Sequence, residues 1–203
     1  MKLIGMLDSP YVRRVAISAK RLGIDLEHQS VSVFRHFEQF QQINPVVKAP
    51  TLVLDDGEVL IDSTLIIDYL EALAGPGNSL MPEDLNQRLR SLRLIGLALA
   101  ACEKSVQLYY ERNLRPAEIQ FEPWVERVEG QLAAAYSALE RELELRPLKT
   151  DGSIDQDGIT LAVAWSFTRL VVPDQVDAWQ FPLISAFTDY AEGLEAFMST
   201  PIE

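Results

Sequence analysis

Three short motifs in this chain could together hold and activate a small peptide ligand. Ser9-Pro10 follows a short apolar run, Ala49-Pro50 precedes another, and Asp62-Ser63 precedes a longer apolar segment. A serine followed by proline is a common start for a helix, where the hydroxyl can cap main-chain N–H groups. At the same place a hydroxyl and the helix dipole could also stabilise a thiolate. Ser9 therefore has two candidate roles.

The free energies involved are compatible with the thiolate role. Lowering a thiol pKa from ~8.5 by about two units requires about 2.7 kcal/mol. A hydrogen bond to a charged group contributes about 1.5–3 kcal/mol, and a helix dipole adds about 0.3–1 kcal/mol. One serine hydroxyl at a helix N-terminus could thus activate a bound thiol. Taken alone, Ser9 is better explained as a cap; together with the other two motifs, it is better explained as an activating group.

The other two motifs offer contacts to the remainder of an extended peptide. A proline that opens a strand costs no ladder hydrogen bond, so Ala49-Pro50 can be a plain strand boundary. If its peptide bond is cis, the main chain of Ala49 faces outward, where a peptide could pair with it as an added strand. Asp62-Ser63 can simply cap a helix, or Ser63 and nearby N–H groups can hold a carboxylate while Asp62 meets an ammonium. Lys48 could pair with an anionic end of such a ligand.

The first part of the chain alternates between strand and helix patterns. Strands are predicted over residues 2–7 and 26–33, helices over 10–22, 34–43 and 63–73, and a hairpin over 51–61 with its turn at 55–57. The order β-α-β followed by β-β-α is that of a thioredoxin-like domain. A Gly- and Pro-rich stretch at 75–78 is typical of a linker.

Beyond the linker the apolar period is helical throughout. The predicted apolar faces are Leu85, Leu89, Leu92, Gly96, Leu99, Val106 and Tyr110 on a long helix; Trp124, Val128, Leu132, Tyr136, Leu139 and Leu143 on a second; and Leu183, Phe187, Tyr190, Leu194 and Phe197 on a last one. Residues 160–171 are apolar nearly all round, which predicts a helix buried in a bundle. We therefore predict a thioredoxin-like α/β domain over residues 1–78 and an all-α helical-bundle domain over residues 79–203.

Composition and charge argue against several classes of protein. Residues 1–78 carry 7 Lys/Arg and 10 Asp/Glu, and residues 79–203 carry 11 and 20, which gives the net charge of -12 and disfavours nucleic-acid binding. The longest apolar run, 94–102, is far shorter than the ~20 residues of a membrane span. Asp8 interrupts the first apolar run, so we expect a strand there and no signal peptide. The single cysteine, Cys102, excludes an internal disulfide, and we predict a cytoplasmic protein.

The remaining candidate residues carry weaker signals. Tyr11, Tyr109, Tyr110 and Trp165 could line an apolar pocket, although aromatic residues at helical spacing are more often core. His28 and His36 lack partners in a metal or catalytic pattern and are predicted to be surface residues. Cys102 is predicted to be inert packing in a helix, and Asp55-Asp56 to belong to a turn.

Residues 9–15, 44–50 and 62–70 together resemble the cytosolic glutathione transferases, nearest to serine-type classes such as the plant tau enzymes and bacterial relatives. The resemblance covers the whole chain in domain order. It implies that Ser9 activates the sulfur of glutathione, that the main chain of Ala49 holds its cysteinyl part, and that Asp62 with Ser63 holds its γ-glutamyl part. It also implies glutathione as co-substrate without a metal, a small hydrophobic electrophile bound with the help of the helical domain, a role in detoxification, and a homodimer.

Two positions depart from the family pattern. The family's buried helix usually begins with Ser or Thr followed three residues later by Asp, a capping box, whereas this chain has Thr160 and Val163. The loop 44–50 is one residue shorter than the tau-type pattern, which shifts Lys48 within it.

Three functions are compatible with the resemblance. The leading hypothesis is transfer of the glutathione thiolate to an electrophile. The alternatives are glutathione-dependent isomerisation or peroxide reduction, and a non-catalytic protein-binding module like the stringent starvation proteins that bind RNA polymerase. The fold alone does not separate them. Ser9 and Asp62-Ser63 favour the enzyme, because a pure interaction module needs no carboxylate site.

Overall fold

A computed structural model describes residues 1–202 of the chain, which form two compact units. The first, called the sheet unit here, comprises Met1–Leu80 together with the residues from Leu194 onward; the second, the helical unit, is Met81–Gly193. The predicted boundary lay between residues 78 and 79, and the observed division follows Leu80. The final residues, which we had assigned to the all-α domain, pack with the sheet unit instead.

The sheet unit contains a four-stranded sheet in the order β2-β1-β3-β4. Its strands are β1 (Lys2–Ile4), β2 (Glu27–Gln29), β3 (Thr51–Val53) and β4 (Val59–Ile61). β1 runs parallel to β2 and antiparallel to β3, and β3 runs antiparallel to β4. The parallel pair requires a crossover, which the first helix supplies, while a tight turn suffices for the hairpin. The predicted thioredoxin-like order is confirmed, although β1 and β2 are shorter than predicted.

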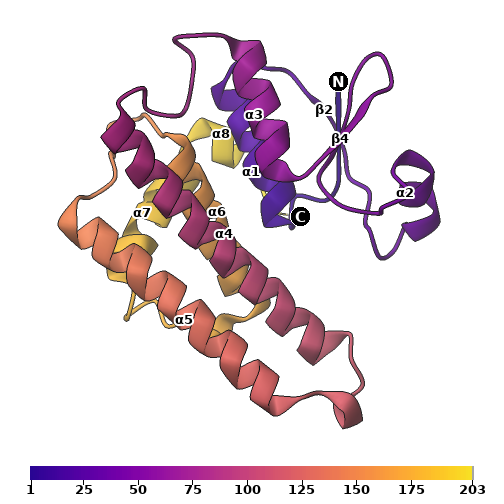
Figure 1. Cartoon of the computed structure of the whole chain (residues 1–203), viewed down its shortest axis with the longest axis vertical. Helices are drawn as coiled ribbons and strands as arrows, with labels where there is room; N and C mark the ends of the chain where they lie inside the picture. The colour runs from indigo at the N-terminus through magenta and orange to yellow at the C-terminus, as the bar shows by residue number, and fades with distance from the viewer. Residues whose placement is uncertain (203) are drawn as a thin grey trace. The chain divides into compact units, whose positions relative to one another are not determined.

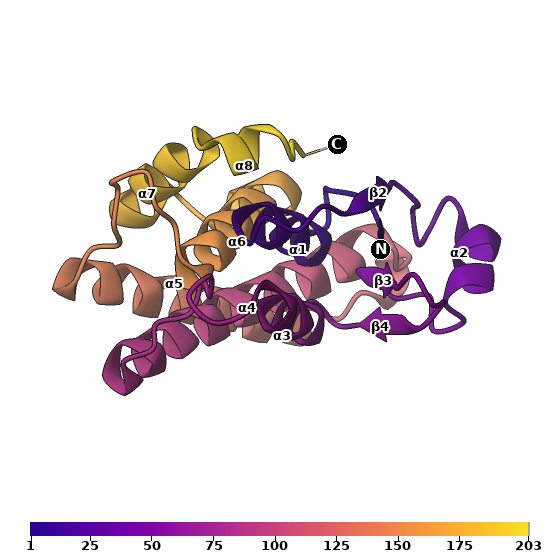
Figure 2. The same cartoon turned by 90° about the horizontal axis from the view of Figure 1, so that it is seen from above.

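Helices cover both faces of this sheet. α1 (Pro10–Arg21) and α3 (Ser63–Ala74) lie on one face and α2 (Phe37–Ile43) on the other (Figures 1 and 2). The apolar side chains of α1, among them Val12 and Val15, are buried, and on the opposite side Phe40 of α2 packs against β1. α2 begins three residues later than predicted because the Ser32 hydroxyl accepts hydrogen bonds from the N–H groups of residues 34 and 35, which form a turn.

The single last helix that we predicted is in fact two. α7 (Pro182–Glu192) ends in the helical unit, and α8 (Glu195–Met198) packs against α1 in the sheet unit. Phe197 is fully buried there, with the Arg13 guanidinium 5.5 Å from its ring centroid. Arg13 Nε also donates to the main-chain oxygen of Thr200 at 2.9 Å. The apolar period runs unbroken through both helices, so it could not show that their side chains enter different cores.

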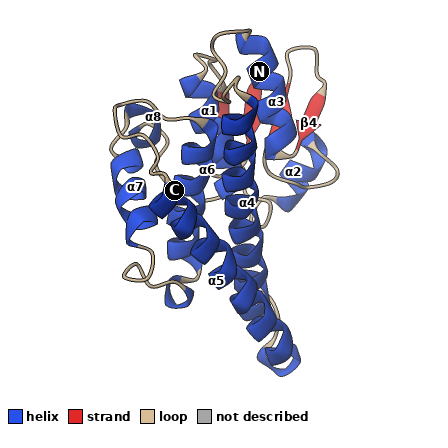
Figure 3. Cartoon of the chain, turned by 60° about the vertical axis from the view of Figure 1, so that its left-hand side comes forward, coloured by secondary structure: helices blue, strands red, loops and turns tan. Residues whose placement is uncertain are grey.

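The helical unit is built on α4 (Leu85–Asn113), α5 (Glu122–Leu145), α6 (Gln156–Val171) and α7, with short 3-10 turns at Ala117–Ile119 and Pro173–Gln175. α4 packs against α5 and α6, and α7 packs against α6 and α5. Figure 3 shows this unit entirely in helices and loops, with the strands confined to the sheet unit. The predicted all-α bundle is confirmed. None of the helices described in residues 1–202 has both the length and the apolar character needed to cross a membrane.

The N-terminal part of α6 differs from the prediction. The helix is buried on nearly all sides, as predicted, but it begins at Gln156 rather than at Thr160. The Thr160 hydroxyl donates to the main-chain oxygen of Gln156 at 2.8 Å, one turn inside the helix. Thr160 therefore does not cap α6. The valine at 163, where the family pattern has Asp, costs this helix no capping interaction, because both positions lie inside the helix.

The apolar face predicted for α4 is mostly exposed, and only Leu99 and Val106 of it are half-buried. Leu85, Leu89 and Leu92 are 78%, 66% and 52% exposed. The residues that pack inward are instead Ser91, Leu94, Ile95, Ala98, Ala101, Cys102, Ser105 and Leu108. A long helix can carry two apolar stripes, and its period does not show which one meets its neighbours. The face predicted for α5 is buried, apart from Trp124 at 40% exposure.

Candidate functional site

The three motifs of the sequence lie along one edge of the sheet. Ile4 of β1 pairs with Thr51 of β3, and Thr51 pairs with Ile61 of β4, so these residues form a row across three strands. The chain leaves β1 towards Ser9 just after this row, enters β3 from Ala49-Pro50, and leaves β4 into Asp62. Because neighbouring strands are ~4.8 Å apart, the strand residues that lead to the three motifs, Ile4, Thr51 and Ile61, lie within about 10 Å of one another.

Ser9 stands at the N-terminus of α1, where Pro10 occupies the first helical position. Its hydroxyl makes no capping hydrogen bond, although its backbone is in the extended conformation usual for an N-cap. The main-chain groups are engaged: Ser9 N–H donates to Met6, and Arg13 N–H donates to the Ser9 oxygen. Ser9 is half-buried. The plain capping role is therefore not observed, and the hydroxyl stands at a helix N-terminus where it could meet a ligand.

The Ala49-Pro50 peptide bond is cis, and the ladder between β1 and β3 begins only at Thr51. The loop before it is held by two buried polar side chains that sequence reasoning missed, Asn44 and Thr51. Asn44 Nδ2 donates to Thr51 Oγ1 at 2.9 Å, and Thr51 Oγ1 donates to the main-chain oxygen of Lys48 at 2.7 Å. The Val46 N–H donates to Asn44 Oδ1 at 3.0 Å. The available signal was a threonine in an apolar strand, seven residues after an asparagine that precedes proline.

Gly5 brings the first two motifs close together. Its φ of +136° lies in a region that favours glycine, and a β-carbon placed there would stand 2.6 Å from Val12 Cγ2 and 3.1 Å from Ala49 Cβ. Only a residue without a side chain allows the loop between β1 and α1, which leads to Ser9, to pass so near Ala49. This glycine was not singled out from the sequence.

Asp62 and Ser63 open α3 in different ways. Asp62 is exposed, has φ +71°, and caps the helix by accepting from the Thr64 N–H at 2.9 Å. Ser63 is only 3% exposed, and its hydroxyl accepts from Arg14 Nη1 at 3.0 Å. The first N–H groups of a helix lack intrahelical acceptors, and Asp62 satisfies only that of Thr64.

Arg14 is the charged residue that sequence reasoning missed at this site. It is 2% exposed, and besides Ser63 it donates to Thr64 Oγ1 at 3.2 Å, so its cation lies beneath the start of α3. The helix N-terminus and this buried cation both favour an anion, which suits a carboxylate. The available signal was a pair of arginines, Arg13 and Arg14, between the apolar residues of α1.

The other candidates fall into surface and core positions. Lys48 is exposed in the loop before the cis bond. Trp165 is 1% exposed and stacks edge-on against Tyr136 with 5.0 Å between ring centroids, so it belongs to the core, as favoured. Tyr110 is 41% exposed, while Tyr11 and Tyr109 are half-buried.

The residues predicted to lack a catalytic role are placed as expected. Cys102 is buried and forms no disulfide. His28 and His36 are exposed, and His28 Nε2 lies 2.7 Å from the main-chain oxygen of Gly5. Asp55 belongs to the hairpin turn and pairs with the N-terminal ammonium at 2.6 Å. Within residues 1–202, no group of three His, Cys, Asp or Glu side chains could hold a metal ion.

Comparison with known proteins agrees with this geometry. A family model for the N-terminal domain of glutathione S-transferase matches residues 3–79. The uncharacterized GST-like protein YibF of Escherichia coli K12 is 30% identical over 174 residues, 85% of each chain. The maleylacetoacetate isomerase of Pseudomonas aeruginosa is 30% identical over 147 residues, 68% of this chain and 69% of its own.

Solved structures extend the similarity to the complete fold. A glutathione transferase family member from Pseudomonas fluorescens Pf-5, crystallised with bound glutathione, superposes with a TM-score of 0.86 at 29% identity, over 100% of this chain and 98% of its own. A glutathione S-transferase from Methylobacillus flagellatus, with glutathione bound, has a TM-score of 0.87 at 24% identity, over 100% and 99% of the two chains, and shares the fold. On its sequence and fold, this chain belongs to the glutathione S-transferase family.

Proposed function

We propose that this protein is a glutathione transferase in which Ser9 stabilises the glutathione thiolate and the thiolate attacks an electrophilic small molecule. The observation that carries the proposal is the placement of Ser9: its hydroxyl stands at a helix N-terminus without capping it, on the sheet edge that also holds the Ala49 and Asp62-Ser63 motifs. The glutathione bound to the similar protein of P. fluorescens supports the choice of ligand.

The proposed contacts are distributed along the whole length of glutathione, which is a tripeptide. The main chain of Ala49, outside the ladder, pairs with the cysteinyl part, and the start of α3 receives the γ-glutamyl carboxylate. Because the Ser63 oxygen accepts from Arg14, its O–H remains to donate to that carboxylate. Asp62 meets the ammonium, and Lys48 pairs with an anionic end of the ligand.

The chemical step needs no further catalytic group. The thiol of bound glutathione loses its proton to solvent, and the Ser9 O–H donates to the resulting sulfur anion. The thiolate lone pair forms a C–S bond to the electrophilic carbon, and the electron pair leaves with the displaced group or is protonated after addition. We propose that the helical unit supplies apolar surface for the electrophile.

The division of labour between Ser9 and Ser63 is testable. Ser9→Ala should raise the apparent pKa of bound glutathione in an ultraviolet titration and depress turnover while binding is nearly kept. Ser63→Ala should weaken binding by about 1.5–3 kcal/mol, roughly ten- to a hundredfold, and change turnover at saturating glutathione far less, because that contact is equal in ground and transition states. Ser137→Ala, at an exposed serine of α5, is the matched control. If both mutants lose binding alike and neither changes turnover, the protein is better described as a non-catalytic binding module.

Isomerisation is a second candidate, favoured by the 30% identity to the maleylacetoacetate isomerase of P. aeruginosa. The same thiolate could add to a conjugated double bond and be expelled after rotation, so glutathione would be required but not consumed. Peroxide reduction would instead yield oxidised glutathione. Following free thiol, oxidised glutathione and conjugate in one assay separates the three reactions.

We also propose a homodimer in the cytoplasm. The exposed stripe of Leu85, Leu89 and Leu92 on α4 supports self-association, because three leucines more than half exposed on one helix face are unusual on a solvated surface. The one cysteine is buried and forms no disulfide, as suits a reducing compartment.

A further inference from the structure

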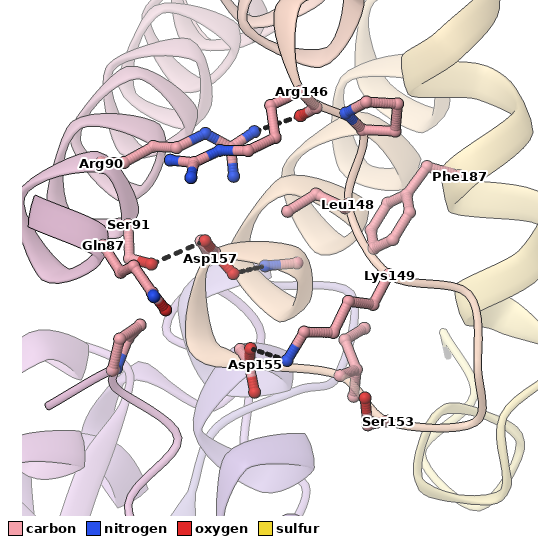
Figure 4. A pocket seen from close by; sticks show the side chains of 14 residues that line it. Gln87, Arg90, Ser91, Arg146, Leu148, Lys149, Ser153, Asp155, Asp157 and Phe187 are labelled. Carbon is pink, nitrogen blue, oxygen red and sulfur yellow. Dashed lines mark hydrogen bonds and ion pairs between the residues drawn. The ribbon is translucent and has the colours of Figure 1, made fainter. Parts of the chain in front are cut away.

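A cavity of about 220 Å³ in the helical unit gathers positive charge in an otherwise acidic part of the chain. It lies between the start of α4, the segment that follows α5, and the start of α6 (Figure 4). Arg90, Arg146 and Lys149 line it. Residues 81–193 contain 11 Lys/Arg and 18 Asp/Glu, a net charge of -7, so three cations around one cavity run against the charge of the whole unit.

Two of these cations lack a carboxylate partner. Figure 4 shows the guanidinium groups of Arg90 and Arg146 side by side at one end of the cavity. Arg90 donates to the main-chain oxygen of Glu142, in the last turn of α5, and to that of Arg146, which follows the helix. Among the ion pairs of residues 1–202, neither guanidinium is within 4.0 Å of a carboxylate. Partial burial and then the charge of Arg146 lower the pKa of Arg90, while Asp157 and Glu142 act in the opposite direction.

The two acids that line the cavity are engaged elsewhere. Asp155 pairs with Lys149 at 3.6 Å, which cancels one charge of each sign. Asp157 is buried and accepts from the Ser91 hydroxyl and from the Gly158 N–H, each at 2.8 Å. The negative charge of Asp157 offsets one of the two positive charges of Arg90 and Arg146, so the cavity keeps a net charge of about +1. The cavity is thus suited to a single negative charge and not to a multiply charged anion.

The remaining walls are largely apolar, with Leu148, Ile154 and Phe187 beside two prolines. We propose that this cavity binds a small monocarboxylate with an apolar body, its carboxylate bridging Arg90 and Arg146 and its body lying against Leu148 and Phe187. Guanidinium groups match the two oxygens of a carboxylate in geometry and charge. Every lining residue belongs to the helical unit, so the site does not depend on Ser9 or on the proposed transferase reaction.

Benzoate and its uncharged isostere benzamide are suitable probes, used on the full-length protein saturated with glutathione. Titration followed by amide NMR should show benzoate shifting resonances of residues 87–91 and 146–158, with a dissociation constant of about 1 mM or tighter. Benzamide should bind about tenfold more weakly or not at all. Benzoate shifts confined to other residues, or equal binding of both probes, would overturn the proposal. Tighter binding of inorganic phosphate than of benzoate would also overturn it.

Arg146→Gln is the informative variant. The Arg146 side chain is exposed, and Arg90 donates its hydrogen bond to the main-chain oxygen of Arg146, so the substitution keeps that bond and removes only the guanidinium. It should weaken benzoate binding about tenfold and leave glutathione binding unchanged. Arg141→Gln removes the same charge from an exposed position of α5 that does not line the cavity, and should leave benzoate binding intact. Equal effects of the two substitutions would show that general charge, not the cavity, attracts the anion. Loss of glutathione binding in Ser63→Ala with benzoate binding kept would separate the two sites.

Discussion

At the scale of single residues, the candidate site combines groups with distinct duties. Ser9 is placed where it can act on a ligand. Three buried residues support the site instead: Arg14 donates to the Ser63 hydroxyl, and Asn44 and Thr51 hold the main chain before the cis bond. Asp62 belongs to both groups, since it caps α3 with one carboxylate oxygen and is exposed to solvent. Its φ of +71° is rare for a residue with a side chain, and such conformations gather at functional sites.

Two substitutions at Asp62 should separate its structural and binding duties. Asp62→Asn keeps an equally good N-cap and tolerates positive φ, so the free energy of unfolding should change little, while loss of the charge proposed to meet the glutathione ammonium should weaken binding about tenfold. Asp62→Ala should weaken binding similarly and also cost about 1 kcal/mol of stability. Urea unfolding and calorimetric titration measure the two effects. Unchanged glutathione binding in Asp62→Asn would remove the carboxylate from ligand recognition.

At the scale of elements, the helix that carries Ser9 is held by the end of the chain. α8 packs on α1, and Arg13, one turn after Ser9, contacts both Phe197 and Thr200. The sheet unit is therefore assembled from two separate stretches of sequence, and its stability depends on the residues after Leu194.

Phe197→Ala should be strongly destabilising. The side chain is fully buried, so its truncation removes transfer free energy and leaves a cavity, for an expected loss of about 3–5 kcal/mol in urea unfolding. Met198→Ala, in the same short helix but 62% exposed, is the control and should cost far less. Similar stability of the two variants would show that the chain end does not support the sheet unit.

A second element-scale feature is the polar network between α5 and α6. The Tyr136 hydroxyl lies 2.6 Å from Thr168 Oγ1 and 3.1 Å from the Ala164 oxygen, in the core of the helical unit. Burial raises the pKa of Tyr136 well above its usual range, although the Thr168 hydrogen bond acts in the opposite direction.

This raised pKa predicts a specific alkaline instability. Below the unfolded-state pKa of ~10, the Tyr136 hydroxyl keeps its proton in both the folded and the unfolded protein. The free energy of unfolding therefore does not depend on this group there. Above it the unfolded state ionises while the folded state does not, so the free energy of unfolding falls as the pH rises. Tyr136→Phe should cost about 1 kcal/mol at pH 7 but flatten this decline. Parallel profiles for the native protein and Tyr136→Phe would contradict the assignment.

At the scale of the whole molecule, the proposed dimer depends on the apolar stripe of α4. Leu89→Lys places a charge in the middle of that stripe, while Asn86→Lys places the same charge at an exposed position beside it. Light scattering at micromolar concentration should give twice 22.8 kDa for the native chain and for Asn86→Lys, and a mass near 22.8 kDa for Leu89→Lys. A native mass near 22.8 kDa would refute the dimer, and an unchanged mass for Leu89→Lys would place the interface elsewhere.

The sequence by itself determined the features that depend on neighbouring residues. The succession of strands and helices along residues 1–78 followed from apolar periodicity and turn residues, and the start of α1 from Ser9-Pro10, because these signals act within a few residues. The three motifs of the candidate site could also be predicted from the sequence, because each places a serine, a proline or an aspartate at the start of a helix or strand.

Tertiary structure alone decided which surfaces meet. α4 presents two apolar stripes, and only its packing against α5 and α6 shows that Leu94 and Ala98 face inward while Leu85 and Leu89 face outward. Arg14 meets Ser63 across 49 residues of sequence, and Arg13 meets Thr200 across 187. Local patterns carry no information about such contacts, because the free energy of burying a side chain depends on what packs against it and not on its place in the chain.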